Sequence, residues 1–230
     1  MENVTIQYRF RLPDGSEEIF RIHIDAQRLE LVGNMPDTLP AWTILHFHQC
    51  PHCPVTADKQ PNCPIAVNLV NIVTRFDHLL SYEQTHIDIT TAERIVSQDT
   101  TVQEGISSLM GLVMATSGCP HTAFFKPMAR FHLPFASEEE TIYRAASTYL
   151  LAQYFAKKEG WNADLELEGL TEIYQNMHIV NTSMEERLRG ASERGSTLNA
   201  IVFLDMYALT LQHVIQGALE ELRYLFTPFS

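Results

Sequence analysis

Each of the four cysteines in this chain is followed directly by a proline. Cys50, Cys53 and Cys63 lie close together in the sequence, and Cys119 lies far beyond them. A proline ring fixes its own φ angle and removes a backbone N–H, which stiffens the turn that presents the preceding sulfur. The repeated Cys-Pro step therefore predicts that the four cysteines share one local role and tie distant parts of the fold together.

Cys50 and Cys53 have the C-x2-C spacing at which two thiolates can bind one metal ion from a single turn. With Cys63 and Cys119 they provide four thiolates, which suit a structural Zn²⁺ ion. A [4Fe-4S] cluster is the alternative, because the spacing does not separate the two. Two metal-free interpretations also remain: buried cysteines that pack as small apolar side chains, and a redox switch between Cys50 and Cys53.

Half of the ten histidines lie near the cysteines in sequence, and two of them directly follow a Cys-Pro step, in the HFHQCPHCP and GCPHT segments. These two, His52 and His121, are candidates to replace a thiolate or to support the ligands through hydrogen bonds.

A second candidate site follows Cys119, where cations stand in an apolar segment that three prolines interrupt. Lys126, Arg130 and His132 could there line a pocket for an anionic small molecule. The alternative is a covering loop in which Arg130 pairs with one of the many acidic residues. Farther along the chain, Asp205 stands within the apolar segment IVFLDMYALTL, and we expect it to be buried beside an arginine.

The first hundred residues are expected to be rich in strands. Apolar and polar residues alternate over 4–12 and 20–24, with turn residues between them, which predicts an antiparallel hairpin. Further strands are expected at Leu29 and Leu31, over 42–47 and over 85–90. One helix is expected between the last two of these strands, starting at Pro64.

The remainder of the chain is expected to be helical. Apolar spacing predicts helices over 103–117, 137–158, 168–189 and from about 196 to 225. The second of them starts with the S-x-x-E capping box of Ser137 and Glu140. The prolines within 119–135 rule out one regular helix there. We therefore expect one α+β unit over residues 1–230, with a sheet-rich part packed on a helical bundle and a soft internal boundary near residue 100.

Composition and charge restrict the function. Sixteen Lys and Arg residues against 28 Asp and Glu residues give a net charge of -12, which disfavours nucleic acid and anionic membranes as partners. The N-terminus does not resemble a secretory signal, and the most apolar stretch, 106–115, is too short to span a bilayer, so we expect a cytoplasmic protein. The familiar nucleotide-binding and hydrolase motifs are missing from the sequence, and we assign no enzyme class.

The segments HFHQCPHCPV and LMGLVMATSGCPHTAFFKPMARFHLPF resemble an uncharacterised bacterial family that is classed as a domain of unknown function. The resemblance covers most of the chain and implies a bacterial origin and a shared cysteine pattern, but no activity. Together with the cysteines, it leads us to expect a metal-binding protein with a regulatory or protein-interaction role, whose partner is another protein or a second copy of the chain. A redox enzyme with an iron–sulfur or open metal centre is the alternative.

Overall fold

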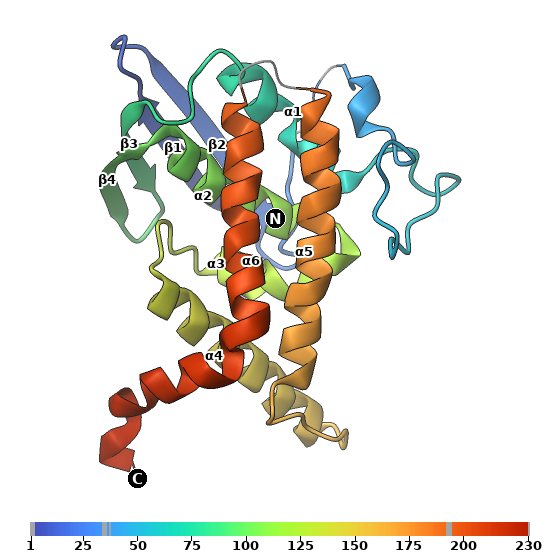
Figure 1. Ribbon diagram of the computed structural model, residues 1–230, viewed down its shortest axis with the longest axis vertical. Coiled ribbons are helices and arrows are strands. Elements are labelled where there is room, and N and C mark those ends of the chain that lie inside the picture. Colours follow the sequence, from blue (N-terminus) through green and yellow to red (C-terminus); the bar gives the residue numbers. More distant parts are fainter. Residues whose placement is uncertain (1–2, 34–35, 37, 192–194, 230) are drawn as a thin grey trace.

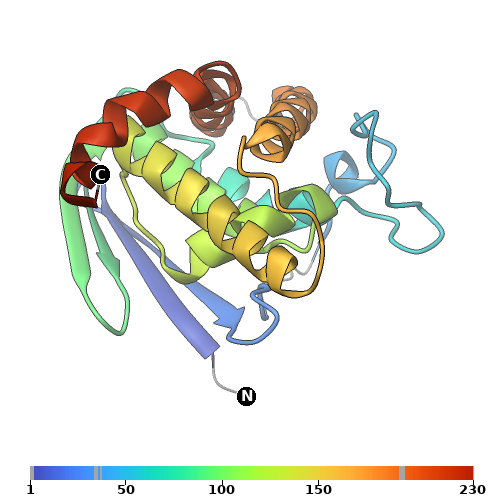
Figure 2. The same ribbon diagram turned by 90° about the horizontal axis from the view of Figure 1, so that it is seen from below.

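The computed structural model describes residues 3–33, 36, 38–191 and 195–229. Its first part is a four-stranded antiparallel sheet in the order β2-β1-β3-β4, made of β1 (Asn3–Arg11), β2 (Glu17–Asp25), β3 (Gln84–Thr90) and β4 (Ile95–Thr101). The predicted hairpin is confirmed as β1 and β2, paired from Asn3 opposite Asp25 to Arg11 opposite Glu17. The fold class is α+β, as the sequence predicts, with the helices on one side of the sheet (Figures 1 and 2).

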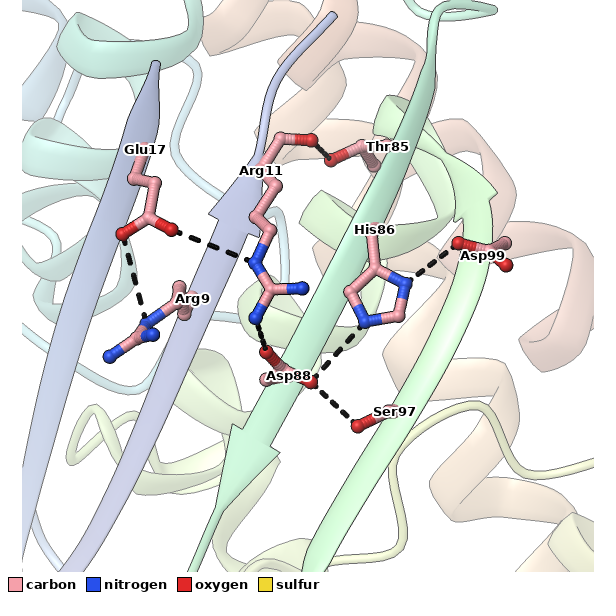
Figure 3. Close-up of polar contacts among 8 residues, drawn as sticks. All are labelled: Arg9, Arg11, Glu17, Thr85, His86, Asp88, Ser97 and Asp99. Carbon is pink, nitrogen blue, oxygen red and sulfur yellow. Dashed lines mark hydrogen bonds and ion pairs between the residues drawn. The ribbon is translucent and has the colours of Figure 1, made fainter. Parts of the chain in front are cut away.

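One face of the sheet is apolar and packed, and the other carries a polar network (Figure 3). Asp88 on β3 lies at its centre, where it accepts hydrogen bonds from Arg11 at 2.7 Å and from Ser97 at 2.6 Å. His86 lies 3.3 Å from Asp88 and 2.7 Å from Asp99 on the edge strand β4. These contacts join β1, β3 and β4 on the exposed face. The polar side chains that point to this face therefore have partners on the neighbouring strands.

Two of the expected strands do not form. Residues 42–47, expected as a strand, instead start with the short 3₁₀ helix η1 (Ala41–Thr43) and continue as turns. The Thr43 and Ile44 amides donate to carbonyls three residues earlier, so they cannot take part in a strand ladder. Leu29 has a positive φ of 54° and Leu31 makes only an isolated bridge to Ile24, because the side chain of Asp25 closes a turn just before them. The polar edge strand β4 lacks apolar alternation and was not predicted.

The predicted helices are confirmed. They are α1 (Pro64–Phe76), α2 (Val102–Thr116), α4 (Glu138–Lys158), α5 (Glu168–Arg189) and α6 (Ser196–Glu221), which continues into the 3₁₀ helix η3 (Leu222–Phe229). The Ser137–Glu140 capping box is present at the start of α4. Between α2 and α4 the proline-interrupted segment forms only η2 (Pro120–Phe125) and the short α3 (Lys126–Arg130). The long helices α5 and α6 lie side by side (Figure 1).

A single core runs through both parts of the chain. Helix α2 connects them, because Gly105 on α2 allows the helix to approach Ile87 and Phe10 on the sheet. A polar link crosses the same boundary: the Tyr8 hydroxyl on β1 lies 2.8 Å from Ser108 Oγ on α2 and 2.5 Å from His132 Nε2. The junction between β4 and α2, at residues 101 and 102, therefore does not interrupt the packing.

Candidate functional site

The loop between η1 and α1 holds three of the cysteines and lies on the side of the molecule away from the sheet (Figures 1 and 2). Within it, the Cys53 amide donates to the Cys50 carbonyl at 3.0 Å, which closes the C-x2-C segment into a turn. The loop returns beside its own start, where the Cys63 amide donates to the Thr43 carbonyl at 2.8 Å. The turn holds Cys50 and Cys53 close together, and the return contact brings Cys63 back beside the start of the loop.

Two of the Cys-Pro steps start helices. Cys63 precedes α1 as its N-cap residue and Cys119 precedes η2 in the same way, and the following prolines occupy the first helical positions. Proline is favoured there because its missing N–H would have no helical partner. The sequence pattern therefore has a local structural cause at Cys63 and Cys119, in addition to any role of the sulfurs.

Arg187 on α5 organises the start of the cysteine loop. Its guanidinium donates to the carbonyls of Trp42 and Ile44 at 2.8 Å and of Leu45 at 2.7 Å. Only 2% of the residue is exposed. The carbonyls of Trp42, Ile44 and Leu45 thus bond to an arginine side chain in place of a neighbouring strand, which is one reason that residues 42–47 do not form a strand.

Within the described residues, Arg187 has no carboxylate partner. Burial lowers the pKa of its guanidinium, and the nearby thiols of Cys63, Cys50 and Cys53 oppose that shift. Arginine nevertheless stays charged in proteins. Among the described residues, this buried cation therefore has neutral carbonyl groups as its hydrogen-bond partners, and it lies close enough to three cysteines to interact with their charge.

His52 and His121, which the sequence suggested separately as ligands or supporting groups, lie against each other. Their rings stack with centroids 3.9 Å apart, and His121 Nε2 lies 3.1 Å from the His52 carbonyl oxygen. Both ring nitrogens of His52 are buried without a hydrogen-bond partner among the described residues. Burial and His121 lower the pKa of His52, and the Asn176 backbone on α5 opposes this shift. The stack connects the cysteine loop to the segment that follows Cys119.

The four thiols do not form a ligand set. Cys63 and Cys119 are buried, and Cys50 and Cys53 are half-buried. Burial raises the pKa of Cys119 to about 12, with smaller contributions from Cys63 and Cys50, and burial likewise raises the pKa of Cys50. Over the described ranges, no three Cys, His, Asp or Glu side chains are positioned to hold a metal ion. The expected four-cysteine centre is thus not assembled in this structure.

The three cations of the second candidate site lie in different environments. Lys126 pairs with Glu30 at 2.8 Å, and the Arg130 guanidinium lies over the Phe131 ring at 5.4 Å. His132 is held by Tyr8 and lines a cavity among the helices. Asp205 does not have the expected arginine partner and instead binds His178 Nδ1 at 2.9 Å and Asn181 Nδ2 at 3.2 Å.

Sequence reasoning missed Arg187 and Arg144 as functional candidates. Arg187 had a detectable signal, because it stands on the apolar face of α5 with Val180 and Met184, where a charged residue is unusual. Arg144 on α4 lines the same cavity as His132, but nothing in its sequence neighbourhood distinguishes it from a surface arginine.

Comparison with known proteins identifies the family. The model of the family described as Domain of unknown function (DUF6901) matches residues 6–227. The chain belongs to this family. No curated protein and no solved structure matches the DUF6901 chain. Within its described part, no helix combines the length and the apolar character of a membrane span.

Proposed function

We propose that Cys50, Cys53, Cys63 and Cys119 bind one metal centre that lies against the Arg187 guanidinium. The observation that carries this proposal is the buried arginine charge beside three cysteines with no carboxylate partner among the described residues. Burying an ion without a counter-charge is costly. Metal binding requires deprotonated thiolates, so the centre would supply the missing negative charge.

Both expected metals are consistent with this charge balance. Zn²⁺ with four thiolates and a [4Fe-4S] cluster with four thiolates each have a net negative charge. A single zinc ion needs sulfurs at about 2.3 Å, so the four thiols would have to move together. A cluster would likewise need the four cysteines brought together, because no such ligand group is assembled among the described residues.

The role depends on the metal. A zinc centre would join the cysteine loop to α5 and to the end of α2, and the cytoplasmic protein would then act in regulation or in protein binding. A cluster beside the His52–His121 stack would favour the redox-enzyme alternative, because histidines can move protons that accompany electrons.

The test is elemental analysis of untagged protein purified without oxygen. We expect about one zinc or about four irons per chain. Cys53→Ser and Cys119→Ser should lose most of this metal, whereas His46→Ala, at an exposed position of the same loop, should retain it. Broad visible absorbance that dithionite bleaches would identify the cluster.

Two results would contradict the proposal. One is wild-type protein without stoichiometric metal, in which case reversible oxidation of Cys50 with Cys53 would favour the thiol switch. The other is Cys119→Ser protein with unchanged metal content and melting temperature, which would show that Cys119 is not the fourth ligand.

A further inference from the structure

A cavity of about 350 Å³ lies among the helices, separate from the cysteine loop. Its walls come from the end of β4, from α2, α4, α5 and α6 and from the proline-interrupted segment, and they are mostly apolar. On α2 the lining extends from Glu104 to Ala115. At a rise of about 1.5 Å per residue this is a length of about 16 Å. The cavity therefore has the size and lining of a small-molecule site, and it is elongated along α2.

Arg144 provides the positive charge of this cavity. Among the described residues that line it, Arg144 is the one Lys or Arg side chain. Its Nη2 donates to the Met128 carbonyl at 2.8 Å and to the Phe131 carbonyl at 3.4 Å, while no described protein group accepts from its Nη1 or Nε. It has no ion pair with a described carboxylate. An arginine with two free donor groups at an apolar wall is suited to a carboxylate, which accepts paired hydrogen bonds.

His132 lines the same cavity without competing for the anion. Burial, with a smaller contribution from the Arg144 charge, lowers its pKa to about 3, so its imidazole is neutral near pH 7. Its Nε2 already lies 2.5 Å from the Tyr8 hydroxyl. Of the three cations that the sequence suggested for an anion pocket, only His132 lines the cavity, and Arg144 provides the charge.

Asn181 provides an unsatisfied acceptor in the cavity wall. It is 3% exposed, and its Nδ2 donates to Asp205 Oδ1 at 3.2 Å. Its Oδ1 is buried and has no partner among the described residues. Asn181 lies seven residues beyond Tyr174 on the cavity side of α5, which corresponds to about 10 Å. Tyr174 is close enough to Arg144 for the arginine charge to lower the pKa of its hydroxyl, although burial raises that pKa more strongly.

We propose that this cavity binds a small apolar molecule with one carboxylate, which Arg144 holds, and with a hydroxyl or N–H donor that reaches Asn181 Oδ1. Each end of the ligand would satisfy a group that the protein leaves unpaired. The apolar body between them would replace water along the α2 wall. This inference is independent of the metal centre, because none of the four cysteines lines the cavity.

The test is calorimetric titration of the full chain with three probes that share one alkyl chain: ω-hydroxydecanoate, decanoate and decanol. We expect affinity to fall in that order. Arg144→Gln should weaken both carboxylates by about tenfold or more and leave decanol unchanged. Asn181→Leu should remove the preference for the hydroxyl. Arg130→Gln is the matched control, because Arg130 is a nearby cation outside the cavity lining.

If Arg144→Gln fails to fold, a second variant and a mapping experiment still test the proposal. Ala208→Leu adds volume at the α6 wall and should abolish binding while the circular dichroism spectrum is unchanged. In methyl spectra of the wild-type protein, decanoate should shift the Met128 and Met177 signals. Equal affinity for decanol and decanoate, an unchanged decanoate affinity in Ala208→Leu, or shifts confined to exposed methyls would each overturn the inference.

Discussion

At the scale of single residues, the buried Arg187 holds a distant backbone segment in place. Its three hydrogen bonds hold the carbonyls of a segment that lies more than 140 residues away in the sequence. The guanidinium can make these bonds because it presents several donors in one plane.

We predict that Arg187→Met lowers the free energy of unfolding by about 3 kcal/mol, because three charge-assisted hydrogen bonds are lost. Chemical denaturation of metal-loaded protein measures this change. Metal removal should then lower the melting temperature of Arg187→Met less than that of the wild type, since the variant has no cation left without a counter-charge. An equal loss in both proteins would argue against charge balance between Arg187 and the centre.

The His86 network on the sheet surface gives a second prediction for single residues. The hydrogen bond to Asp99 is the main reason that the pKa of His86 lies above its ordinary value of 6.5, and Asp88 adds to the shift. The protonated form is favoured in the folded state, so the stabilisation is complete below the ordinary pKa. It is lost as the pH rises through the folded value.

We expect Asp99→Asn to return the pKa of His86 toward 6.5, as measured by NMR titration of the ring protons. Glu93→Gln is the control, because Glu93 is an exposed acid on the turn between β3 and β4. An unchanged His86 titration in Asp99→Asn would show that the Asp99 contact is not formed in solution.

At the scale of elements, α2 forms the join between the sheet and the bundle. Its glycines serve different purposes. A Cβ atom at Gly105 would lie 2.1 Å from Ile87 Cδ1 and 2.8 Å from Phe10 Cε1, whereas one at Gly111 would lie 3.4 Å from Leu204 Cδ2. Gly105 is required by close packing on the sheet, and Gly111 is not.

We therefore predict that Gly105→Ala destabilises the protein by about 1 to 3 kcal/mol, because buried side chains on the sheet must move. Gly111→Ala, in the same helix, should be neutral or stabilising by up to about 1 kcal/mol, because alanine favours the helix. Urea denaturation of the two variants compares them directly. Equal effects would mean that α2 does not approach the sheet as closely as described.

Helix ends were predictable where side chains close to one another in sequence determine them. The S-x-x-E pattern at Ser137 and Glu140 predicts the start of α4, since both capping bonds lie within four residues. The prediction of a strand over 42–47 was wrong. Three carbonyls of this segment bond to Arg187, and no local sequence pattern contains that contact. The edge strand β4 was missed because an exposed edge needs little apolar alternation.

At the scale of the whole molecule, the core includes both parts of the chain, with β1, α1, α2 and α5 contributing to one buried cluster. The Tyr8–Ser108 and Tyr8–His132 contacts and the His52–His121 stack cross the boundary near residue 100 at separate places. Neither part could bury its apolar face alone.

We predict that the chain unfolds in a single cooperative step and that fragments 1–101 and 102–230 are each unfolded. Urea transitions followed by circular dichroism should coincide with those followed by hydrogen exchange at β1 and α5 amides. Separate transitions, or a folded fragment, would contradict a single unit.

The sequence by itself determined the hairpin, the order and approximate bounds of the long helices, the break after α2 and the presence of an unusual cysteine pattern. Each depends on residues that lie within a few positions of one another, where periodicity, capping and proline geometry act directly. Only the tertiary structure placed Arg187 beside the cysteine loop, stacked His52 on His121 and formed the cavity of Arg144 and Asn181. Those features depend on contacts between residues up to 145 positions apart, and such contacts exist only after the helices pack against one another and the sheet.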